Sequence, residues 1–406
     1  MKTLKNIGKI ALLSLALCGG TTSCNYLDVV PPEQASLPDA TKDPESTLGF
    51  LFSCYGGIRN PFDYQTVEAG ADEYVLPPLW NTGSQKITWD LNLPTNIADG
   101  WSWGSNYRFI GQCLLFLQQL PHARGVTDEQ KRAWAAEANF LLAYYHMVTL
   151  VAYGPCPITD TYIDQATPES EYNGRMHFDY VKDWICQKFD EVCEDGQLPA
   201  TRTGDEWGRA TSVMAKALKA RLLVYAASPL FNGSFPYKDW ENTNFETPGY
   251  GKELISLKYD RKKWEVAKAA CQEAITAAEA AGHKLFSLED AQSLYQQAGL
   301  PLPFVPFKSA EGGTADKDKE FMERVQLMRY VVTTRYKEGN RETIWGLANQ
   351  GTMIIGSLPH RVIKNNQGTW KSGYSGVSPT LNTVERFYTE NGVPIEKDNQ
   401  VYPQSE

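Results

Sequence analysis

The chain has 406 residues, of which 42% are hydrophobic and 21% are charged, a composition typical of a globular protein with a sizeable core. Its formal net charge is −9, and it holds no long run of Lys and Arg, which argues against a nucleic-acid partner. Aromatic residues make up 12% of the chain, and both helix packing and carbohydrate sites use such rings.

Residues 1–23 have the pattern of a secretory signal peptide. Lys2, Lys5 and Lys9 precede a short apolar stretch, 10–17, which is too short to span a membrane. The small residue Ser23 before Cys24 is typical of a bacterial lipoprotein processing site and predicts that Cys24 carries the lipid. An ordinary signal peptide with an incidental cysteine is the alternative. Residues 24–44 then form an acylated tether, and 45–406 form a single domain.

The segment 57–100 lacks a helical period and contains many Pro and Gly residues, with short strands expected at 72–75 and 86–89. Long irregular segments are disproportionately functional. Aromatic residues that match no core stripe lie in this segment or just after it: Tyr74, Trp80, Trp89, Trp101 and Trp103. Exposed rings of this kind can stack on sugars, whereas rings that only pin the segment onto helices are the alternative.

Helices are predicted in pairs, at 101–152, at 176–229 and from 261 onward, a pattern that suggests tetratricopeptide-like repeats. Thr127 and Gln130 fit a capping box, in which each side chain accepts a hydrogen bond from the other residue's backbone N–H. In the stretch 208–231, Thr211 is a suitable N-cap and Ser228 before Pro229 a suitable end. This helix is expected to be buried over most of its circumference, and the rest of the chain is expected to pack on it.

No pattern of catalytic or metal-binding residues is found. The five histidines show no triad order or metal spacing, and His146 is interpreted as a hydrogen-bonded core residue. The adjacent acids, Asp72 with Glu73 and Asp205 with Glu206, are poorly placed to face one glycosidic bond. Six cysteines follow Cys24 without a C-x-x-C pair and are expected to be buried free thiols. We therefore expect no enzyme activity, no cofactor and no metal.

Several stretches together resemble blocks of the SusD/RagB family of nutrient-binding outer-membrane lipoproteins. They are GRATSVMAKALKARLLVYAASPLF at 208–231, EANFLLAYY at 137–145, ETIW at 342–345 and PTLNTVERFYTENGVPI at 379–395. The resemblance implies a mainly α fold, with a tetratricopeptide-like helical-repeat body and a loop-rich, irregular ligand-binding face. It also implies a strand at 342–345 and a capped helix after Pro379. Family members usually continue past the last block, so the loop-rich part 286–406 is expected to be truncated.

The family's role, as implied by the resemblance, is that of a lipid-anchored protein on the outer-membrane surface. Such a protein binds oligosaccharide or peptide and delivers it, as a lid, to a SusC-like TonB-dependent β-barrel transporter. The expected ligand-binding residues are Trp80, Tyr74, Trp101, Trp103 and Asp72, the last matching an acidic position of the family's loop. A stand-alone surface glycan-binding lipoprotein and a helical-repeat protein-interaction scaffold are the two other functions considered.

Overall fold

The computed structural model describes residues 37–58, 73–77, 89, 93, 103–164, 166–297, 321–346 and 363–398, the last two ranges with gaps. Most of the described chain is helical. The longer helices are α2 (Pro44–Tyr55), α4 (Trp103–Gln119), α5 (Asp128–Tyr153), α6 (Phe178–Glu191), α7 (Ser212–Ala227), α8 (Arg261–Ala280) and α9 (Leu288–Gln297). The expected mainly α class is confirmed, and each predicted helix of the three pairs lies within a few residues of its observed position.

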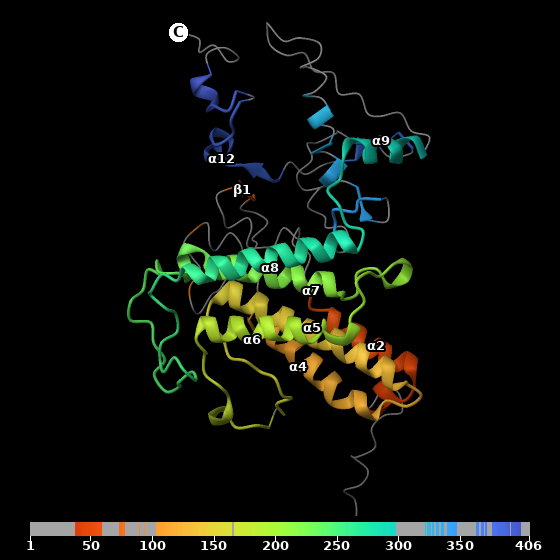
Figure 1. The fold of residues 1–406 in the computed structure, drawn as a ribbon, viewed down its shortest axis with the longest axis vertical. Coiled ribbons are helices and arrows are strands. Elements are labelled where there is room, and N and C mark those ends of the chain that lie inside the picture. The colour runs from red at the N-terminus through yellow and green to blue at the C-terminus, as the bar shows by residue number, and fades with distance from the viewer. Residues whose placement is uncertain are drawn as a thin grey trace, which may run out of the picture.

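The helices form a layered stack in which successive elements pack on one another. The packed pairs are α2 with α4, α4 with α5, α5 with α6, α6 with α7 and α7 with α8. In Figure 1 the stack ends at α8, and α9, β1 and the short helix α12 (Leu381–Glu385) lie beyond it. Of the described helices, α8 packs mainly on α7 and reaches α6 through the Lys263–Asp179 ion pair.

The centre of the stack is α5, not α7, so the expectation that the rest of the chain packs on helix 211–228 was wrong. Thirteen of the 26 residues of α5 are buried, and α5 contacts α2, α4, α6 and α7. In α7, Val224 is exposed, and Lys216, Lys219 and Arg221 lie among apolar residues. A longer helix with apolar residues on all sides has room for more neighbours, which accounts for the difference.

The predicted helix caps are present. The Thr127 hydroxyl accepts from the backbone N–H of Gln130 at 3.2 Å, and the Gln130 side chain accepts from the N–H of Thr127 at 3.0 Å, which completes the capping box of α5. Thr211 caps α7 in the same manner through the N–H of Met214, and α7 ends before Ser228. These local bonds satisfy backbone donors that a helix start leaves unpaired.

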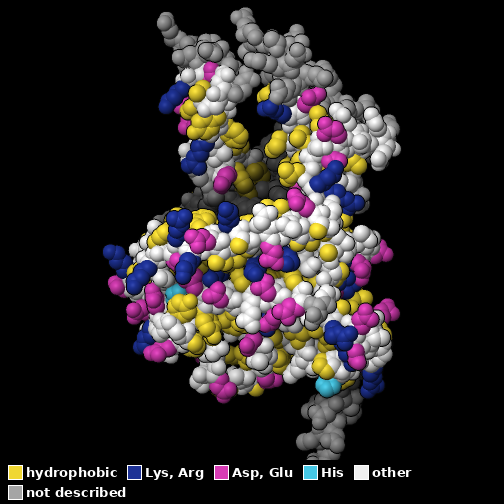
Figure 2. Space-filling model, in the orientation of Figure 1, with side chains coloured by type: hydrophobic (Ala, Val, Ile, Leu, Met, Phe, Trp, Pro, Cys, Tyr) yellow, Lys and Arg dark blue, Asp and Glu magenta, His cyan; other side chains and the backbone are white. Residues whose placement is uncertain are grey.

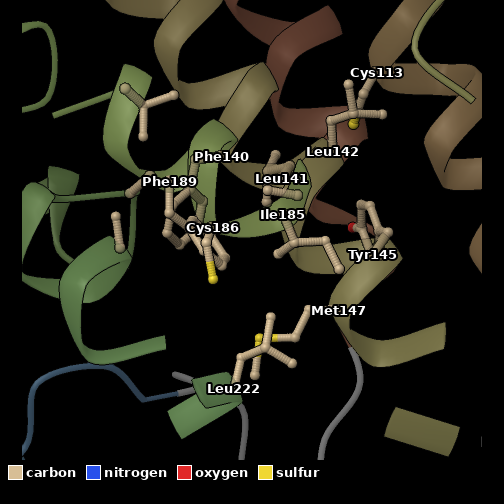
Figure 3. Packing of buried hydrophobic residues seen from close by; sticks show 14 of the residues in the cluster. Cys113, Phe140, Leu141, Leu142, Tyr145, Met147, Ile185, Cys186, Phe189 and Leu222 are labelled. Atoms are coloured by element: carbon tan, nitrogen blue, oxygen red, sulfur yellow. The ribbon is translucent and has the colours of Figure 1, made fainter. Parts of the chain in front are cut away.

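One core fills the space between the helices. Figure 3 shows side chains from α4, α5, α6 and α7 meeting there, among them Cys113, Phe140, Ile185 and Leu222. Phe140 of α5 lies 5.7 Å from Phe189 of α6 between ring centroids. Close packing of aromatic and branched side chains from four helices fixes the spacing of the layers.

A buried carboxylate lies at the centre of this structure. Glu137 of α5 is 0% exposed, and its oxygens accept from Arg202 at 2.9 Å, from Arg209 at 2.5 and 3.1 Å, and from the Tyr55 hydroxyl at 2.6 Å. The Tyr55 hydroxyl also accepts from the backbone N–H of Ala210 at 2.9 Å. The network therefore joins α2, α5 and the segment before α7.

After α9, the described residues between 321 and 332 are helical, and the remaining regular elements are short. The strand β1 (Tyr74–Val75) pairs antiparallel with β4 (Ser378–Pro379), and β2 (Ile363–Lys364) pairs antiparallel with β3 (Trp370–Lys371). As expected, Thr380 caps the helix that follows Pro379, here α12, by accepting from the N–H of Thr383.

The strand expected at 342–345 is not formed, since these residues make turns and bends. Their side chains bond to other parts of the fold instead. Glu342 accepts from the N–H of Phe286 at 3.0 Å, and the Trp345 indole N–H donates to the carbonyl of Gly208 at 3.0 Å. The Trp345 ring also packs on Phe140 and Tyr144 of α5. These contacts hold the segment in a bent conformation against the helical stack.

Two histidines are buried in their neutral form. His146 is hydrogen-bonded through both ring nitrogens, to the carbonyl of Leu142 at 2.8 Å and to the N–H of Thr159 at 3.1 Å, which confirms its interpretation as a core residue. His177 caps α6, its Nδ1 accepting from the N–H of Asp179 at 3.1 Å, and its ring stacks on Tyr250. Burial lowers the pKa of each histidine to about 4.

Replacing Glu137 with Ala is expected to lower the free energy of unfolding by about 3–5 kcal/mol, because Arg202 and Arg209 would lose their buried counter-ion and keep only the exposed Glu206. Glu273→Ala is the matched control. Glu273 pairs with Lys216, but its side chain is half exposed, so the expected loss is no more than about 1 kcal/mol. Urea unfolding of the two variants tests this, and equal losses would contradict the central role of Glu137.

The free energy of unfolding is expected to fall as the pH drops from about 6.5 to about 4. Over this range the unfolded histidines bind protons near their ordinary pKa, whereas folded His146 and His177 bind them only near pKa 4. His146→Gln keeps a donor and an acceptor and should remove up to about 1.4 kcal/mol per pH unit from this slope. Urea titrations between pH 7 and pH 4.5 measure the slope. An unchanged slope in the variant would show that His146 does not contribute.

Candidate functional site

The first part of the candidate ligand-binding face is the β1–β4 pair. Tyr74 lies opposite Pro379 and Val75 opposite Ser378, and the N–H of Thr380 donates to the carbonyl of Glu73 at 3.2 Å. This pairing brings β1 next to the start of α12, about 300 residues later in the chain. Val75 is 41% exposed.

A second part is the exposed tryptophan of the irregular segment. Trp89 is 47% exposed, and Leu93 in the same segment is 52% exposed. An indole ring with nearly half of its surface open offers a flat apolar area of the kind that covers the C–H face of a sugar. Among the described residues of this segment, Trp89 therefore has the best exposure for such a role.

Trp103 has a different environment. It begins α4, and its backbone N–H donates to the Tyr153 hydroxyl at 3.1 Å. Its ring lies 5.1 Å from the Tyr107 ring and 5.4 Å from the Tyr153 ring, and the Arg175 guanidinium lies 4.7 Å from its centroid. Arg175 is itself held by the carbonyl of Pro155 at 2.7 Å. The Trp103 ring thus anchors the start of α4, and a ligand contact there stays a prediction.

The remaining predicted site residues, Cys24, Asp72, Trp80 and Trp101, lie outside the described residues. Tyr74 and Trp103, the two that are described, belong to separate packing environments: Tyr74 to the β1–β4 pair, and Trp103 to the junction of α4 with α5.

Sequence reasoning assigned no binding role to the region around α12. Leu381, Phe387 and Tyr388 are all exposed there, next to the β1–β4 pair. We call Val75, Leu381, Phe387 and Tyr388 the β1–α12 surface. The sequence feature that could have indicated this surface is the pair of adjacent aromatic residues at 387–388, just after the five-residue helix α12. The sequence could not show that both rings point to solvent.

The polar clusters of the described chain have structural roles. Of the adjacent acids Asp205 and Glu206, Glu206 pairs with Arg209 at 2.6 Å and with Arg202 at 3.3 Å. In the part of the chain that the structure describes, no group of three or more His, Cys, Asp or Glu side chains could hold a metal ion. Within the same residues, no helix is both long and apolar enough to cross a bilayer.

A hollow of about 760 Å³ lies between α6 and α8, with α7 beneath it. Basic and acidic side chains are interspersed on this face (Figure 2) and pair across the hollow, Lys263 with Asp179 at 2.8 Å and Lys219 with Asp190 at 2.7 Å. A smaller hollow beside Trp207 and Tyr336 measures about 10 Å³, room for about one water molecule. Paired charges hold the helices together and leave little unbalanced charge for a ligand.

The chain was compared with known proteins. No protein-family model matches it, and no curated protein matches it. The solved structure of BT4246 is 52% identical with a TM-score of 0.79, over 90% of this chain and 60% of that protein. A SusD-like protein, BF3747 from Bacteroides fragilis NCTC 9343, is 17% identical with a TM-score of 0.59, over 89% of this chain and 57% of that protein.

The chain therefore spans 60% of the length of BT4246 and 57% of that of BF3747. BF3747 is described as a SusD-like protein. The chain shares the fold of the SusD-like protein BF3747, which confirms, at the level of the fold, the resemblance inferred from its sequence blocks.

Proposed function

We propose that this chain belongs to a cell-surface lipoprotein that binds oligosaccharides and delivers them, as a lid, to a partner TonB-dependent outer-membrane transporter. The SusD-like fold supports the proposal, together with the lipoprotein signal at 1–24. The lipid would attach at Cys24, residues 24–44 would act as the tether, and 45–406 would form one binding domain. The proposed role is non-catalytic and needs no cofactor.

The exposure of Trp89 is the observation that carries the binding part of the proposal. A half-open indole in the irregular segment, with Val75 of the same segment and the aromatic residues after α12 also exposed, provides apolar area for stacking on sugar rings. Trp80, Trp101 and Asp72 of the same part of the chain are proposed as further contacts, with Tyr74 and Trp103 at its edges.

Replacing Trp80 or Trp89 with Ala is expected to weaken oligosaccharide binding about 5- to 30-fold, because loss of one stacked ring removes on the order of 1–2 kcal/mol. The measurement is affinity electrophoresis or calorimetry of the mature chain against a panel of soluble polysaccharides. Trp264→Ala is the matched control, since Trp264 is similarly exposed, at 42%, but lies on α8.

Unchanged affinity in both Trp80→Ala and Trp89→Ala, for a polysaccharide that the parent chain binds, would contradict the stacking role. Equal weakening by Trp264→Ala would place the site on the helical stack instead. Failure of the parent chain to bind any member of a broad panel would favour the scaffold function.

A large β-barrel protein is expected to co-purify in stoichiometric amount when the lipid-anchored protein is isolated from its own outer membrane in mild detergent. Cys24→Ser is the control, because a chain without acyl groups should leave the membrane fraction. Mass spectrometry identifies the co-purifying proteins. A membrane-bound, folded protein recovered without a barrel would contradict the lid role and favour a stand-alone binder.

A further inference from the structure

Two fully buried thiols face each other across the antiparallel interface between α2 and α4. Three levels of contact define the register. The ring of Phe50 meets that of Phe116 at 5.4 Å, the Cys54 thiol contacts the Cys113 thiol, and Gly57 lies directly against the ring of Phe109. As the chain advances from Phe50 in α2 to Gly57 just after it, α4 runs back from Phe116 to Phe109. Cys54 and Cys113 therefore occupy opposing positions in the middle of the interface.

The surroundings of the two sulfur atoms are dry and closely packed. Both residues are 0% exposed, and the Cys54 Sγ lies 3.7 Å from the carbonyl oxygen of Gln112, the residue before Cys113. Ser53 and Gln112 are joined by a side-chain hydrogen bond of 2.8 Å on the solvent side of the same level. The backbones of α2 and α4 are thus held together at the level where the sulfurs meet.

The other cysteines have different neighbours. The Cys156 thiol contacts the Tyr107 hydroxyl, and the Cys193 thiol lies 3.8 Å from the carbonyl of Ser212. Burial raises the pKa of the Cys113 thiol, and so does the contact with Cys54. Because the thiolate is the reactive form, the folded pair is expected to react slowly.

We propose that Cys54 and Cys113 form an intrachain disulfide that joins α2 to α4. The oxidant is a disulfide-bearing molecule or protein. The thiolate of one cysteine attacks a sulfur of this disulfide, forms a mixed disulfide and releases one thiol of the oxidant. The second cysteine, also as thiolate, attacks the chain's own sulfur in the mixed disulfide and releases the other thiol. Two electrons pass from the chain to the oxidant, and the two cysteine protons end on its thiols.

Because both sulfurs are buried in the folded protein, the disulfide can form only during folding. An oxidant cannot reach either sulfur once α2 lies on α4, so the exchange takes place before these helices dock. The proposed export of the chain provides a compartment in which such exchange is favourable. The structure holds all six cysteines after Cys24 as free thiols, four of them buried, as the sequence predicted, and the proposed disulfide is the oxidised form of the Cys54–Cys113 pair.

Trypsin separates the two residues cleanly, which gives a direct test. Cleavage after Lys42 and Arg59 leaves Cys54 as the only cysteine of peptide 43–59, and cleavage after Arg108 and Arg124 leaves Cys113 as the only cysteine of peptide 109–124. The chain is unfolded in urea, refolded with reduced and oxidised glutathione, unfolded again in urea with N-ethylmaleimide to block every free thiol, and digested without reductant. The expected result is a linked pair, 43–59 with 109–124, as the main crosslink.

Cys186→Ala is the matched control and should leave the linked pair intact, since the buried Cys186 lies on α6, away from this interface. Adding reductant should lower the unfolding midpoint of the linked protein by on the order of 5 °C. The same addition should leave the midpoint of the Cys113→Ala variant unchanged, because this variant has no such bond to break. Folded protein in which both peptides carry only N-ethylmaleimide, or crosslinks distributed over all six cysteines, would overturn the proposal.

Discussion

The fold depends on keeping one charge out of water. A carboxylate buried without partners costs many kcal/mol, so Glu137 can lie inside the stack only while Arg202, Arg209 and Tyr55 surround it. Those partners come from two parts of the chain that are distant in sequence from Glu137, namely α2 and the segment 202–209. Two blocks that carried the family resemblance, the one starting at Glu137 and the one containing Arg209, therefore meet at a single ion pair. Trp345 of a third block reaches the same place through the carbonyl of Gly208.

Features fixed by neighbouring residues could be predicted from the sequence. The capping box of α5, the Thr211 cap of α7 and the apolar stripes of the helices all rest on contacts within one or two turns. What could not be predicted depends on residues far apart. The central position of α5 reflects how many helices it contacts. The bend at 342–345 reflects bonds from Glu342 to Phe286 and from Trp345 to Gly208, neither visible in the local pattern.

The residues of the candidate site were predictable from the sequence to the same extent: local patterns selected them, but contacts between distant residues decide which are exposed. Composition and the absence of a helical period were enough to select the aromatic residues of 57–100, but not to separate open rings from packed ones. Trp103 matches no core stripe, yet its neighbours Tyr153 and Arg175 lie 50 and 72 residues later and hold its ring. Conversely, the block at 379–395 predicted a helix correctly and gave no sign that Phe387 and Tyr388 face solvent.

The outermost helix of the stack, α8, buries less apolar surface than the inner helices. Only four of the 20 residues of α8 are buried, and all four are alanines, at 267, 270, 274 and 278. Methyl groups allow α8 to approach α7 closely, but each removes little apolar area from water, whereas α5 buries leucines and aromatic rings on several sides. Within the stack, local opening is therefore expected to cost least at α8, so that this helix can detach while the layers around Glu137 stay folded.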